Sequence, residues 1–398
     1  MPRVILGDCL DELRKLPNDS VHCCVTSPPY WGLRDYGVEG QLGQEKTPEE
    51  FVEKLVTIFR EVRRVLRGDG TLWLNLGDSY SAHAGKTHGY KDGRRNRAER
   101  KTAGVPDGIR AKNLIGVPWR VAFALQADGW YLRSDIIWHK TNSMPESVKD
   151  RPSRSHEYVF LLTKSDRYFY DFQAIREPIS QKSLSVYTTP QKGDGSGSTG
   201  EKMNAWIESN GGRYYPDSRN KRTVWPIATR SYKGAHFATF PPKLIEPCIL
   251  AGTSDHGCCA GCGSPWQSVY TKTRIATRPG ANTKVSGDNQ VEGNRDPLRH
   301  VTHYTLDRWE PTCKCKTSDG LPLDRVPATV LDPFNGSGTT GAVAIQNGRD
   351  YIGIELNPEY IELTKQRLAE AAATSTAPAR TRKPRHRSST RQTLFEFA

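Results

Sequence analysis

The fold of this chain is decided by the stretch Thr26-Ser27-Pro28-Pro29-Tyr30-Trp31. It follows the apolar run Val21-His22-Cys23-Cys24-Val25, which is typical of a buried β-strand. Two prolines cannot continue a central strand, so the strand must end there in a rigid polar loop. Open α/β sheets bind their ligands at the carboxyl ends of their strands. The pattern therefore predicts a site that contains Ser27 and Tyr30.

This loop suits the binding of a planar group that carries an amino nitrogen. The Ser27 hydroxyl and the Pro28 carbonyl accept hydrogen bonds, Pro29 has no competing N–H, and Tyr30 offers a flat face for stacking. An ordinary strand followed by a proline turn would have the same residues. A second motif has to decide between a site and a turn.

That second motif lies about three hundred residues later, in the run Asp332-Pro333-Phe334-Asn335-Gly336-Ser337-Gly338-Thr339-Thr340. It follows an apolar strand and precedes an apolar helix, Gly341 to Gln346. Glycines at a helix N-terminus let the backbone approach a ligand closely, as in nucleotide-binding loops. Glu355 ends a second strand, Tyr351 to Ile354, at about the interval where such folds place a carboxylate that binds ribose hydroxyls.

In this order, TSPPYW and DPFNGSGTT resemble the amino-methylating DNA methyltransferases of the circularly permuted class, over most of residues 1–370. The resemblance implies an α/β fold with a Rossmann-like, S-adenosylmethionine-dependent methyltransferase sheet that is circularly permuted and carries a target-recognition insert. It implies that the catalytic residues are Ser27, Pro28, Pro29 and Tyr30. The cofactor-binding residues that it implies are Asp8, Phe237, Thr239, Asp332, Phe334, Gly336, Ser337, Gly338, Thr339 and Glu355.

Several of the candidate side chains have a second explanation. Asp8 follows a short strand and would approach the adenine of the cofactor, and it is equally placed to cap the helix that runs to Leu16. Asp78 ends another strand and is either a site residue or a cap. The stretch Phe237 to Pro241 resembles the family's other cofactor motif, but its aromatic residues would also fit a core. His139 and Lys140, at a strand end, either contact the substrate or lie on the surface.

The periodicity of apolar residues predicts the remaining elements. The expected helices cover residues 51–66, 113–125, 243–250 and 359–373, and the expected strands cover residues 71–76, 130–140 and 154–164. Ordered structure is expected to return at residues 224–227. Gly68-Asp69-Gly70 is expected to separate the first of these helices from its strand. We number the sheet's strands one to four from the segments that begin at Thr329, Tyr351, Val4 and Val21. With this numbering, strands from the end and from the start of the chain belong to one sheet, and the two chain ends meet in its middle.

The chain contains nine cysteines, and four of them have the spacing of metal ligands. Cys259 and Cys262 form a C-x-x-C pair, and Cys313 and Cys315 form a second close pair. Four thiolates are the number that a closed structural zinc site needs, so a small zinc-ribbon-like insert is expected. The C-x-C spacing is tighter than usual, and reduced cytosolic thiols are the alternative.

These features divide the chain into six parts. They are a catalytic half of the core (1–178), a target-recognition insert (179–223), a return to the core with a cofactor motif (224–256), a zinc-binding insert (257–320), the S-adenosylmethionine-binding half (321–373) and a disordered basic tail (374–398).

Charge and composition indicate the partners. A net charge of +13 in 398 residues favours a polyanion, and the basic stretches 86–112 and 380–391 strengthen that expectation of double-stranded DNA. The absence of a membrane-length apolar run and of a signal peptide predicts a cytoplasmic protein, in a bacterial cell or a phage-infected host. The final Gln392 to Phe397 loosely resembles peptides that bind sliding clamps.

The resulting prediction for function is site-specific methylation of cytosine N4 in duplex DNA after base flipping, by direct transfer. In the family, Ser at the position of Ser27 is usual for cytosine-N4 enzymes, and Asp or Asn for adenine-N6 enzymes. Adenine N6 is therefore the alternative of the same fold. A catalytically inactive, zinc-stapled DNA-binding protein and a methyltransferase for RNA or protein glutamine are alternatives of other classes.

Overall fold

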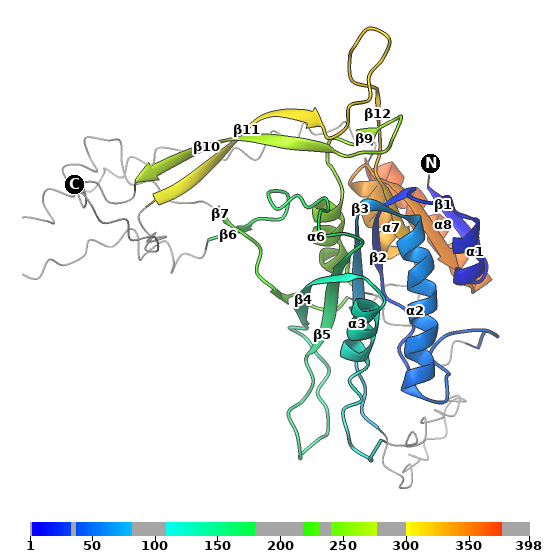
Figure 1. Cartoon of the computed structure of the whole chain (residues 1–398). Helices are drawn as coiled ribbons and strands as arrows, with labels where there is room; N and C mark the ends of the chain where they lie inside the picture. Colours follow the sequence, from blue (N-terminus) through cyan, green and yellow to red (C-terminus); the bar gives the residue numbers. More distant parts are fainter. Residues whose placement is uncertain are drawn as a thin grey trace, which may run out of the picture. The chain divides into compact units, whose positions relative to one another are not determined.

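Eight strands of the described residues form one mixed sheet in the computed structural model (Figure 1). The structure describes residues 2–32, 37–81, 109–179, 218–230, 240–276 and 300–375. In spatial order, the strands of the sheet are β1 (Arg3–Leu6), β14 (Asp350–Glu355), β13 (Thr329–Asp332), β2 (Val21–Thr26), β3 (Leu66–Leu76), β5 (His156–Thr163), β4 (Tyr131–His139) and β8 (Val224–Pro226).

The strand directions gather many strand ends at one edge of this sheet. The five strands from β1 to β3 run parallel to one another. β5 is antiparallel to β3, β4 is antiparallel to β5, and β8 is parallel to β4. The carboxyl ends of every strand except β5 therefore lie at the same edge, together with the amino end of β5. We call it the carboxyl edge, and the opposite one the amino edge.

The two ends of the chain meet in the middle of the sheet. β13 and β14, from the last quarter of the sequence, lie between β1 and β2, from its beginning. Val330 pairs with Cys23 on one side of β13 and with Tyr351 on the other. The expectation that the two chain ends meet in the middle of one sheet is confirmed.

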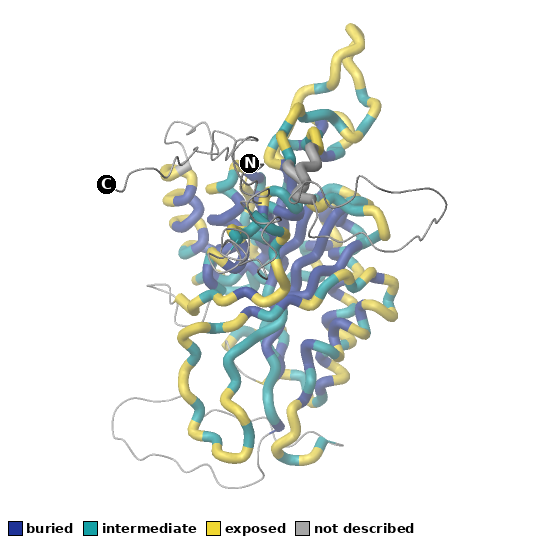
Figure 2. The backbone as a smooth tube through the Cα atoms, turned by 90° about the vertical axis from the view of Figure 1, so that its left-hand side faces the viewer, coloured by how far each residue is buried: buried dark blue, intermediate teal, exposed yellow. Residues whose placement is uncertain are grey.

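Helices cover both faces of the sheet. One face carries α1 (Cys9–Lys15), α2 (Pro48–Val65) and α3 (Val117–Ala127), which share a buried core with Cys24, Leu72 and Leu74. The other carries α6 (Pro242–Gly252), α7 (Thr339–Gln346) and α8 (Pro358–Ser375). Successive strand residues point to opposite faces, so both faces of the central strands are apolar. Figure 2 shows these strands as the buried centre.

The expected break between α2 and β3 is wrong. α2 ends at Val65, and β3 begins directly at Leu66 and continues through the Gly-Asp-Gly stretch to Leu76. A register shift between Val21 and Cys23 lets β2 follow this longer strand. Gly70 fits because a Cβ there would lie 2.7 Å from the Leu66 side chain and 3.1 Å from the His22 carbonyl.

The helix expected from residue 113 begins later, at Val117. Gly116, with φ 77°, occupies the N-cap position, and Pro118 stands in the first turn. The Asp78 carboxylate accepts hydrogen bonds from the backbone N–H of Gly116 at 2.9 Å and of Val117 at 3.0 Å. The helix start is thus fixed by a distant carboxylate, which the periodicity of residues 113–125 does not reveal.

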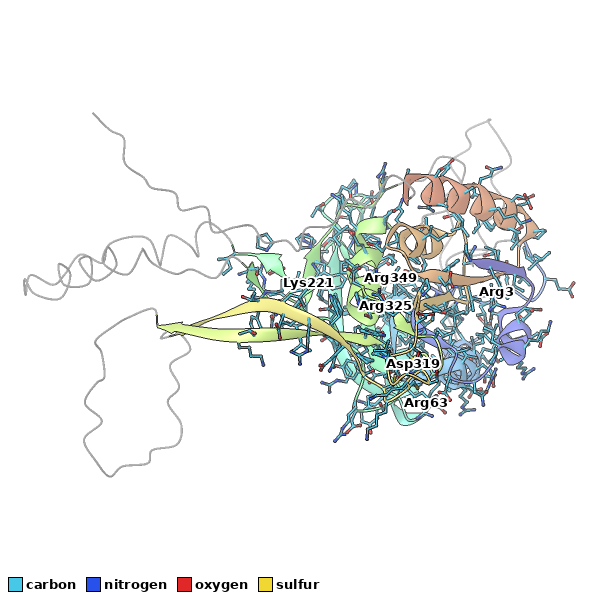
Figure 3. The ribbon with its side chains drawn as sticks, turned by 90° about the horizontal axis from the view of Figure 1, so that it is seen from above. Arg3, Arg63, Lys221, Asp319, Arg325 and Arg349 are labelled. Atoms are coloured by element: carbon cyan, nitrogen blue, oxygen red, sulfur yellow. The ribbon has the colours of Figure 1, made fainter. Side chains whose placement is uncertain are left out.

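Arg349 fastens the end of α6 to the start of β14, and Figure 3 labels it. Only 5% of the residue is exposed. Its Nε donates to the Thr253 hydroxyl at 3.0 Å, its Nη2 donates to the Thr253 carbonyl at 3.2 Å, and its Nη1 pairs with Asp255 at 2.9 Å. These charge-assisted hydrogen bonds offset the cost of removing the guanidinium from water.

A second unit combines two stretches that are far apart in sequence, Ile175–Lys221 and Gln267–Glu310. It contains β6 (Glu177–Pro178) paired with β7 (Ser218–Arg219), and most of the two-stranded ribbon formed by β10 (Trp266–Ala276) and β11 (His300–Pro311). Inside this unit, the Arg176 guanidinium lies 5.9 Å from the centroid of the Tyr304 ring. The unit therefore draws residues from both predicted inserts.

None of the helices in the described residues is long and apolar enough to cross a membrane.

The tight packing of α6 against β2 and β3 leads to a stability prediction. A Cβ at Gly252 would lie 2.5 Å from the Thr71 hydroxyl and 2.7 Å from the Cys23 sulfur. We expect Gly252→Ala to lower the free energy of unfolding by about 1–3 kcal/mol through overpacking. Gly68→Ala is the matched control, because a Cβ at that exposed glycine would meet nothing within 4 Å. Chemical denaturation measures both, and equal stability of the two variants would contradict the packing argument.

Candidate active site

The Gly-rich loop between β13 and α7 is held in place from α8. Gly338 caps α7 with φ 73°, and a Cβ there would lie 2.6 Å from Thr364. Buried Arg367 donates from Nη1 to the Ser337 hydroxyl at 3.0 Å and to the Thr339 hydroxyl at 2.8 Å. Because both hydroxyls face the core, the predicted cofactor roles of Ser337 and Thr339 now rest on their backbone groups.

Asn335 fixes the same loop from within. Its Nδ2 donates to the Gly336 carbonyl and to the Thr364 hydroxyl, each at 2.8 Å, and its Oδ1 accepts from the Tyr351 hydroxyl at 2.7 Å. A Cβ at Gly353 would lie 2.5 Å from this Oδ1, so a glycine is needed in β14 at that point. The loop is therefore preorganised by buried hydrogen bonds.

Asp332 joins the Gly-rich loop to the strand that precedes the Ser-Pro-Pro-Tyr loop. Its carboxylate is fully buried and accepts from the Thr26 hydroxyl at 2.6 Å and from the Thr340 hydroxyl at 2.7 Å. The Phe334 N–H adds a third hydrogen bond at 3.1 Å. Burial raises the pKa of Asp332 to about 6, against the lowering effect of these hydrogen bonds. The two predicted motifs are thus brought together through one carboxylate.

Glu355 lies at the end of β14, beside the loop. Its Oε2 accepts from the Gly336 N–H at 2.7 Å and its Oε1 from the Asn357 N–H at 2.9 Å. Burial raises the pKa of Glu355 to about 7. The carboxylate is therefore placed where the sequence predicted it, and its protonation changes close to neutral pH.

Both aspartates with a second explanation act as helix caps. Asp8 accepts from the Leu10 N–H at 2.9 Å and from the Asp11 N–H at 3.2 Å, and Asp78 accepts from the N–H groups of Gly116 and Val117 at the start of α3. Asp8 also lies next to the site, because the Gly7 N–H donates to the Glu355 carbonyl at 2.9 Å. Its cofactor role stays a prediction that is compatible with capping.

The Ser27 to Trp31 loop leaves β2 at the carboxyl edge. Pro28 and Trp31 are buried, and the Trp31 indole N–H donates to the Glu45 carbonyl at 3.0 Å, which anchors the loop. The Tyr30 ring packs over Gly77, where a Cβ would lie 2.5 Å from the ring. The Ser27 hydroxyl donates to the Tyr30 hydroxyl at 3.4 Å.

Glu157, which the sequence reasoning did not select, and Lys140, which it named as a candidate, complete this group. Glu157, near the start of β5, accepts from the Tyr30 hydroxyl at 2.7 Å and from the Asn75 amide at 3.2 Å. Lys140, at the end of β4, forms an ion pair with the other oxygen of Glu157. A signal was present, because Glu157 opens a strand that is otherwise apolar. Pairing β5 antiparallel to β3 was needed to bring it to this edge.

Several predicted residues lie outside the described residues. They are Phe237 and Thr239 of the second cofactor motif, most of the basic stretch 86–112, most of the recognition insert 179–223, and nearly all of the tail with its clamp-like end.

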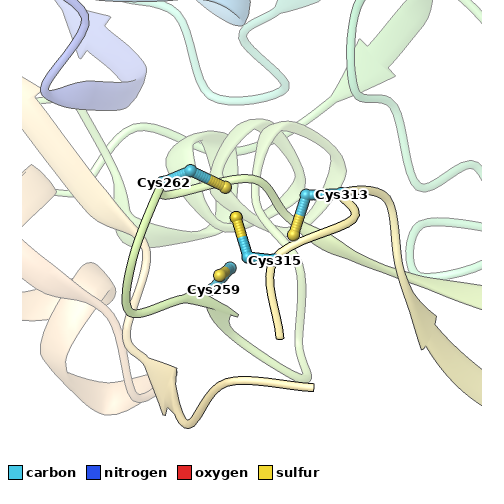
Figure 4. A group of neighbouring side chains, drawn as sticks. All are labelled: Cys259, Cys262, Cys313 and Cys315. Atoms are coloured by element: carbon cyan, nitrogen blue, oxygen red, sulfur yellow. The ribbon is translucent and has the colours of Figure 1, made fainter. Parts of the chain in front are cut away.

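The four predicted metal ligands come together away from this edge. The sulfur atoms of Cys259, Cys262, Cys313 and Cys315 lie within 4.8 Å of one another. Figure 4 shows the side chains pointing toward a common centre. A tetrahedral zinc with bonds of roughly 2.3 Å holds its sulfurs roughly 3.8 Å apart, so the donor set fits zinc after a small contraction.

The cysteine cluster is docked at the amino edge. The His22 Nε2 lies 2.9 Å from the Gly263 carbonyl, and the Arg67 guanidinium donates to the Cys262 carbonyl at 2.6 Å. Both residues stand near the start of their strands, β2 and β3. β9 (Cys258–Cys259), which contains the first ligand, pairs antiparallel with β12 (Arg325–Val326).

Comparison with known proteins agrees with this arrangement. A family model described as DNA methylase (N6_N4_Mtase) matches residues 21–260 and 325–366. Type II methyltransferase M.Cfr9I of Citrobacter freundii is 41% identical over 365 residues, which cover 91% of this chain and 86% of the relative. M.SmaI of Serratia marcescens is 39% identical over 367 residues, which cover 92% and 90%.

Among solved structures, PvuII DNA methyltransferase (cytosine-N4-specific) matches with a TM-score of 0.50 and 16% identity, over 94% of this chain and 91% of that one. This likeness concerns the fold. The family model covers well over half of the sequence, and two long relatives share about two fifths of their residues with it. The chain therefore belongs to the family of N6/N4 DNA methyltransferases.

Proposed function

We propose that this DNA methyltransferase transfers the methyl group of S-adenosylmethionine to the N4 atom of cytosine in duplex DNA. The observation that carries the proposal is the placement of Ser27. It heads the Ser-Pro-Pro-Tyr loop, one residue after Thr26, whose hydroxyl donates to Asp332 of the Gly-rich loop at 2.6 Å. Serine at this position is the residue usual for cytosine-N4 enzymes of the family that the sequence resembles.

The residues around the Gly-rich loop fit the proposed cofactor. Glu355 is a half-buried carboxylate suited to ribose hydroxyls. Gly336 and Gly338 both have positive φ, and a Cβ at Gly336 would meet only the Phe334 carbonyl, at 4.0 Å. Asp8, Phe334 and the backbone of residues 336–339 complete the proposed contacts. S-adenosylmethionine, when bound, supplies an electrophilic methyl group.

The order of the two halves supports circular permutation. In the resemblance stated above, the catalytic motif comes first and the cofactor motif last, and here β2 precedes β13 by about three hundred residues while pairing with it. We assign target recognition to the insert at residues 179–223, as the sequence predicted.

The catalytic loop acts on the base by binding and orientation. After base flipping, Ser27 and the Pro28 carbonyl accept the two amino hydrogens, which directs the nitrogen lone pair at the methyl group. Tyr30 stacks on the base and offsets part of an unstacking cost on the order of a few kcal/mol. Methyl transfer is direct, without a covalent intermediate with the protein.

We further propose that the cysteine cluster holds a structural zinc. Four thiolates leave no open position for a substrate, so the metal would have no catalytic role. The segment between Cys262 and Cys313 includes the ribbon β10–β11, and Thr312 N–H bonds to the Pro265 carbonyl at 3.3 Å. Zinc would hold the two ends of this segment together.

The base assignment is tested by product analysis. Purified protein is incubated with unmethylated bacterial DNA and labelled S-adenosylmethionine, and the nucleosides are identified by mass spectrometry. We expect N4-methylcytosine. N6-methyladenine would agree with the proposed active site but contradict the assignment of cytosine as the target base. A label in RNA or protein alone would contradict the assignment of DNA as the substrate.

Ser27→Ala tests the residue that carries the proposal. Loss of one hydrogen bond to the amino group should lower kcat/KM for DNA by about tenfold or more, or about 1.4 kcal/mol of transition-state stabilisation. Ser153→Ala is the control, because Ser153 is exposed. Full activity of the Ser27 variant in a methyl-transfer assay would count against this site.

The raised pKa of Glu355 predicts two opposite pH dependences. The carboxyl releases its proton more readily in the unfolded chain, at its ordinary value of 4.5, than in the fold, at about 7. Its contribution to stability is therefore lost as pH rises through that interval. Cofactor binding needs the ionised form, so affinity should fall up to about tenfold per pH unit below pH 7.

Calorimetric titration with S-adenosylhomocysteine at pH 6, 7 and 8 measures the affinity. Glu355→Gln should bind weakly, and its affinity should depend less on pH. A wild-type affinity that does not change over this range would contradict the role given to Glu355.

Zinc binding is tested by metal analysis and thermal unfolding. We expect one zinc per chain by mass spectrometry, loss of the metal in Cys315→Ser, and a lower Tm both in that variant and after strong chelation. Cys9→Ser serves as the control, because Cys9 lies outside the cluster. A Cys315→Ser variant that keeps its zinc and its Tm would reject the metal site.

A further inference from the structure

A connected chain of hydrogen bonds runs from the catalytic serine to a carboxylate. Ser27 donates to Tyr30 at 3.4 Å, and Tyr30 donates to Glu157 at 2.7 Å. The three residues come from the loop after β2 and from the amino end of β5, so the sheet topology alone brings them together. The role of Glu157 is not part of the function proposed above.

The ionised state of Glu157 is supported by its neighbours. Lys140 pairs with one carboxylate oxygen, and the Asn75 amide donates to the other at 3.2 Å. Asn75 is 3% exposed and also donates to the Tyr158 carbonyl at 3.0 Å, which fixes its amide orientation. The Glu157 side chain itself is 13% exposed. A charge in this position is paired and hydrogen-bonded, as a partly buried charge must be.

The direction of every bond in the chain follows from Glu157. The Tyr30 hydroxyl lies 2.7 Å from the Glu157 carboxylate and 3.2 Å from the Asn75 Oδ1, and both of these oxygens can only accept. The single Tyr30 proton is therefore donated to this pair of acceptors, of which the charged Glu157 oxygen is the nearer. With its own proton donated, the Tyr30 oxygen accepts from the Ser27 hydroxyl at 3.4 Å, and this contact engages the single proton of Ser27. The Ser27 oxygen can then only accept hydrogen bonds from a substrate, through its lone pairs.

We propose that Glu157 is a positioning residue which, through Tyr30, fixes Ser27 as a hydrogen-bond acceptor facing the target base. The inference rests on the proposed function and explains how the site selects an amino group. A freely rotating serine hydroxyl would bind an amino group or a keto oxygen, whereas a committed one rejects the keto group of thymine or uracil. Buried polar groups that are left unpaired are the usual basis of such rejection.

The surroundings of Tyr30 hold the middle of the chain in place. Its ring lies against Gly77, where a Cβ would come within 2.5 Å, and its backbone carbonyl lies 2.9 Å from the position of a Cβ at Gly43. The phenol therefore has little freedom to turn away from Glu157. The same fixed ring presents one face for stacking, so orientation and stacking are supplied by one side chain.

Glu157→Gln tests the proposal, because the amide keeps the shape and introduces a donor toward Tyr30. After the target site and base have been mapped on methylated DNA, kcat and KM are measured with a duplex that contains the site. We expect kcat to fall about 10- to 100-fold, with KM for DNA changed less than about threefold. Glu61→Gln is the control, since Glu61 is also ion-paired but stands on α2.

A double-mutant cycle separates orientation from a merely structural role. Tyr30→Phe cuts the chain by deleting one oxygen, so Glu157→Gln should cost no more than about twofold in that background. If the Glu157 variant folds poorly, Tyr30→Phe alone still tests the proposal, because it removes the hydroxyl that links Ser27 to Glu157 and should lower kcat as well. Additive losses in the cycle would overturn the proposal.

A binding measurement provides the second readout. Wild-type protein should bind a duplex with cytosine at the target position better than one with uracil there, and Glu157→Gln should narrow this preference. If Glu157→Gln kept both the wild-type kcat and the full preference for cytosine over uracil, the inference about Glu157 would be overturned, and the proposed function would stand. Absence of any DNA methylation by the wild-type protein would instead overturn the proposed function, and the inference with it.

Discussion

The buried carboxylate of Asp332 is the contact on which the carboxyl edge depends. It lies at the end of β13, accepts from Thr26 at the end of β2, and accepts from Thr340 at the start of α7. Removing a carboxylate from water is costly, and three hydrogen bonds offset that cost only while all three partners keep their places. The distance between the Gly-rich loop and the Ser-Pro-Pro-Tyr loop is thereby set by one side chain. Everything proposed for methyl transfer assumes that distance.

The sequence was sufficient to predict the elements that carry a local signal. Two proline- and glycine-rich motifs, each after a short apolar strand, predicted that strands from both ends of the chain share one sheet, as they do. Ser27 follows β2 and Glu355 ends β14, as expected, whereas their roles in the site stay predictions. Each of the two cysteine pairs was recognisable from its local spacing, and the structure brings the two pairs together. Signals of this kind need no knowledge of the partner strand.

Features that depend on pairing between distant segments were missed. Glu157 reaches the site because β5 runs antiparallel to β3, which no periodicity reveals. The start of α3 depends on Asp78, 38 residues earlier, and the Gly-Asp-Gly stretch continues β3 because the strand is packed against β2. Ser337 and Thr339 turned inward to Arg367 for the same reason. Tertiary contacts overruled local preference at each of these points.

The pairing of β2 with β13 also has a consequence for how the protein is made. The Thr26 to Asp332 hydrogen bond joins residues 306 positions apart, so the centre of the sheet cannot close until most of the chain has left the ribosome. Until then, β2 offers an unpaired apolar edge, which is the kind of surface that recruits chaperones or aggregates. Closing so long a loop makes the central pairing slow. Enzymatic competence therefore arrives late, after synthesis of the final strands, which keeps a nascent chain from acting on DNA before it is complete.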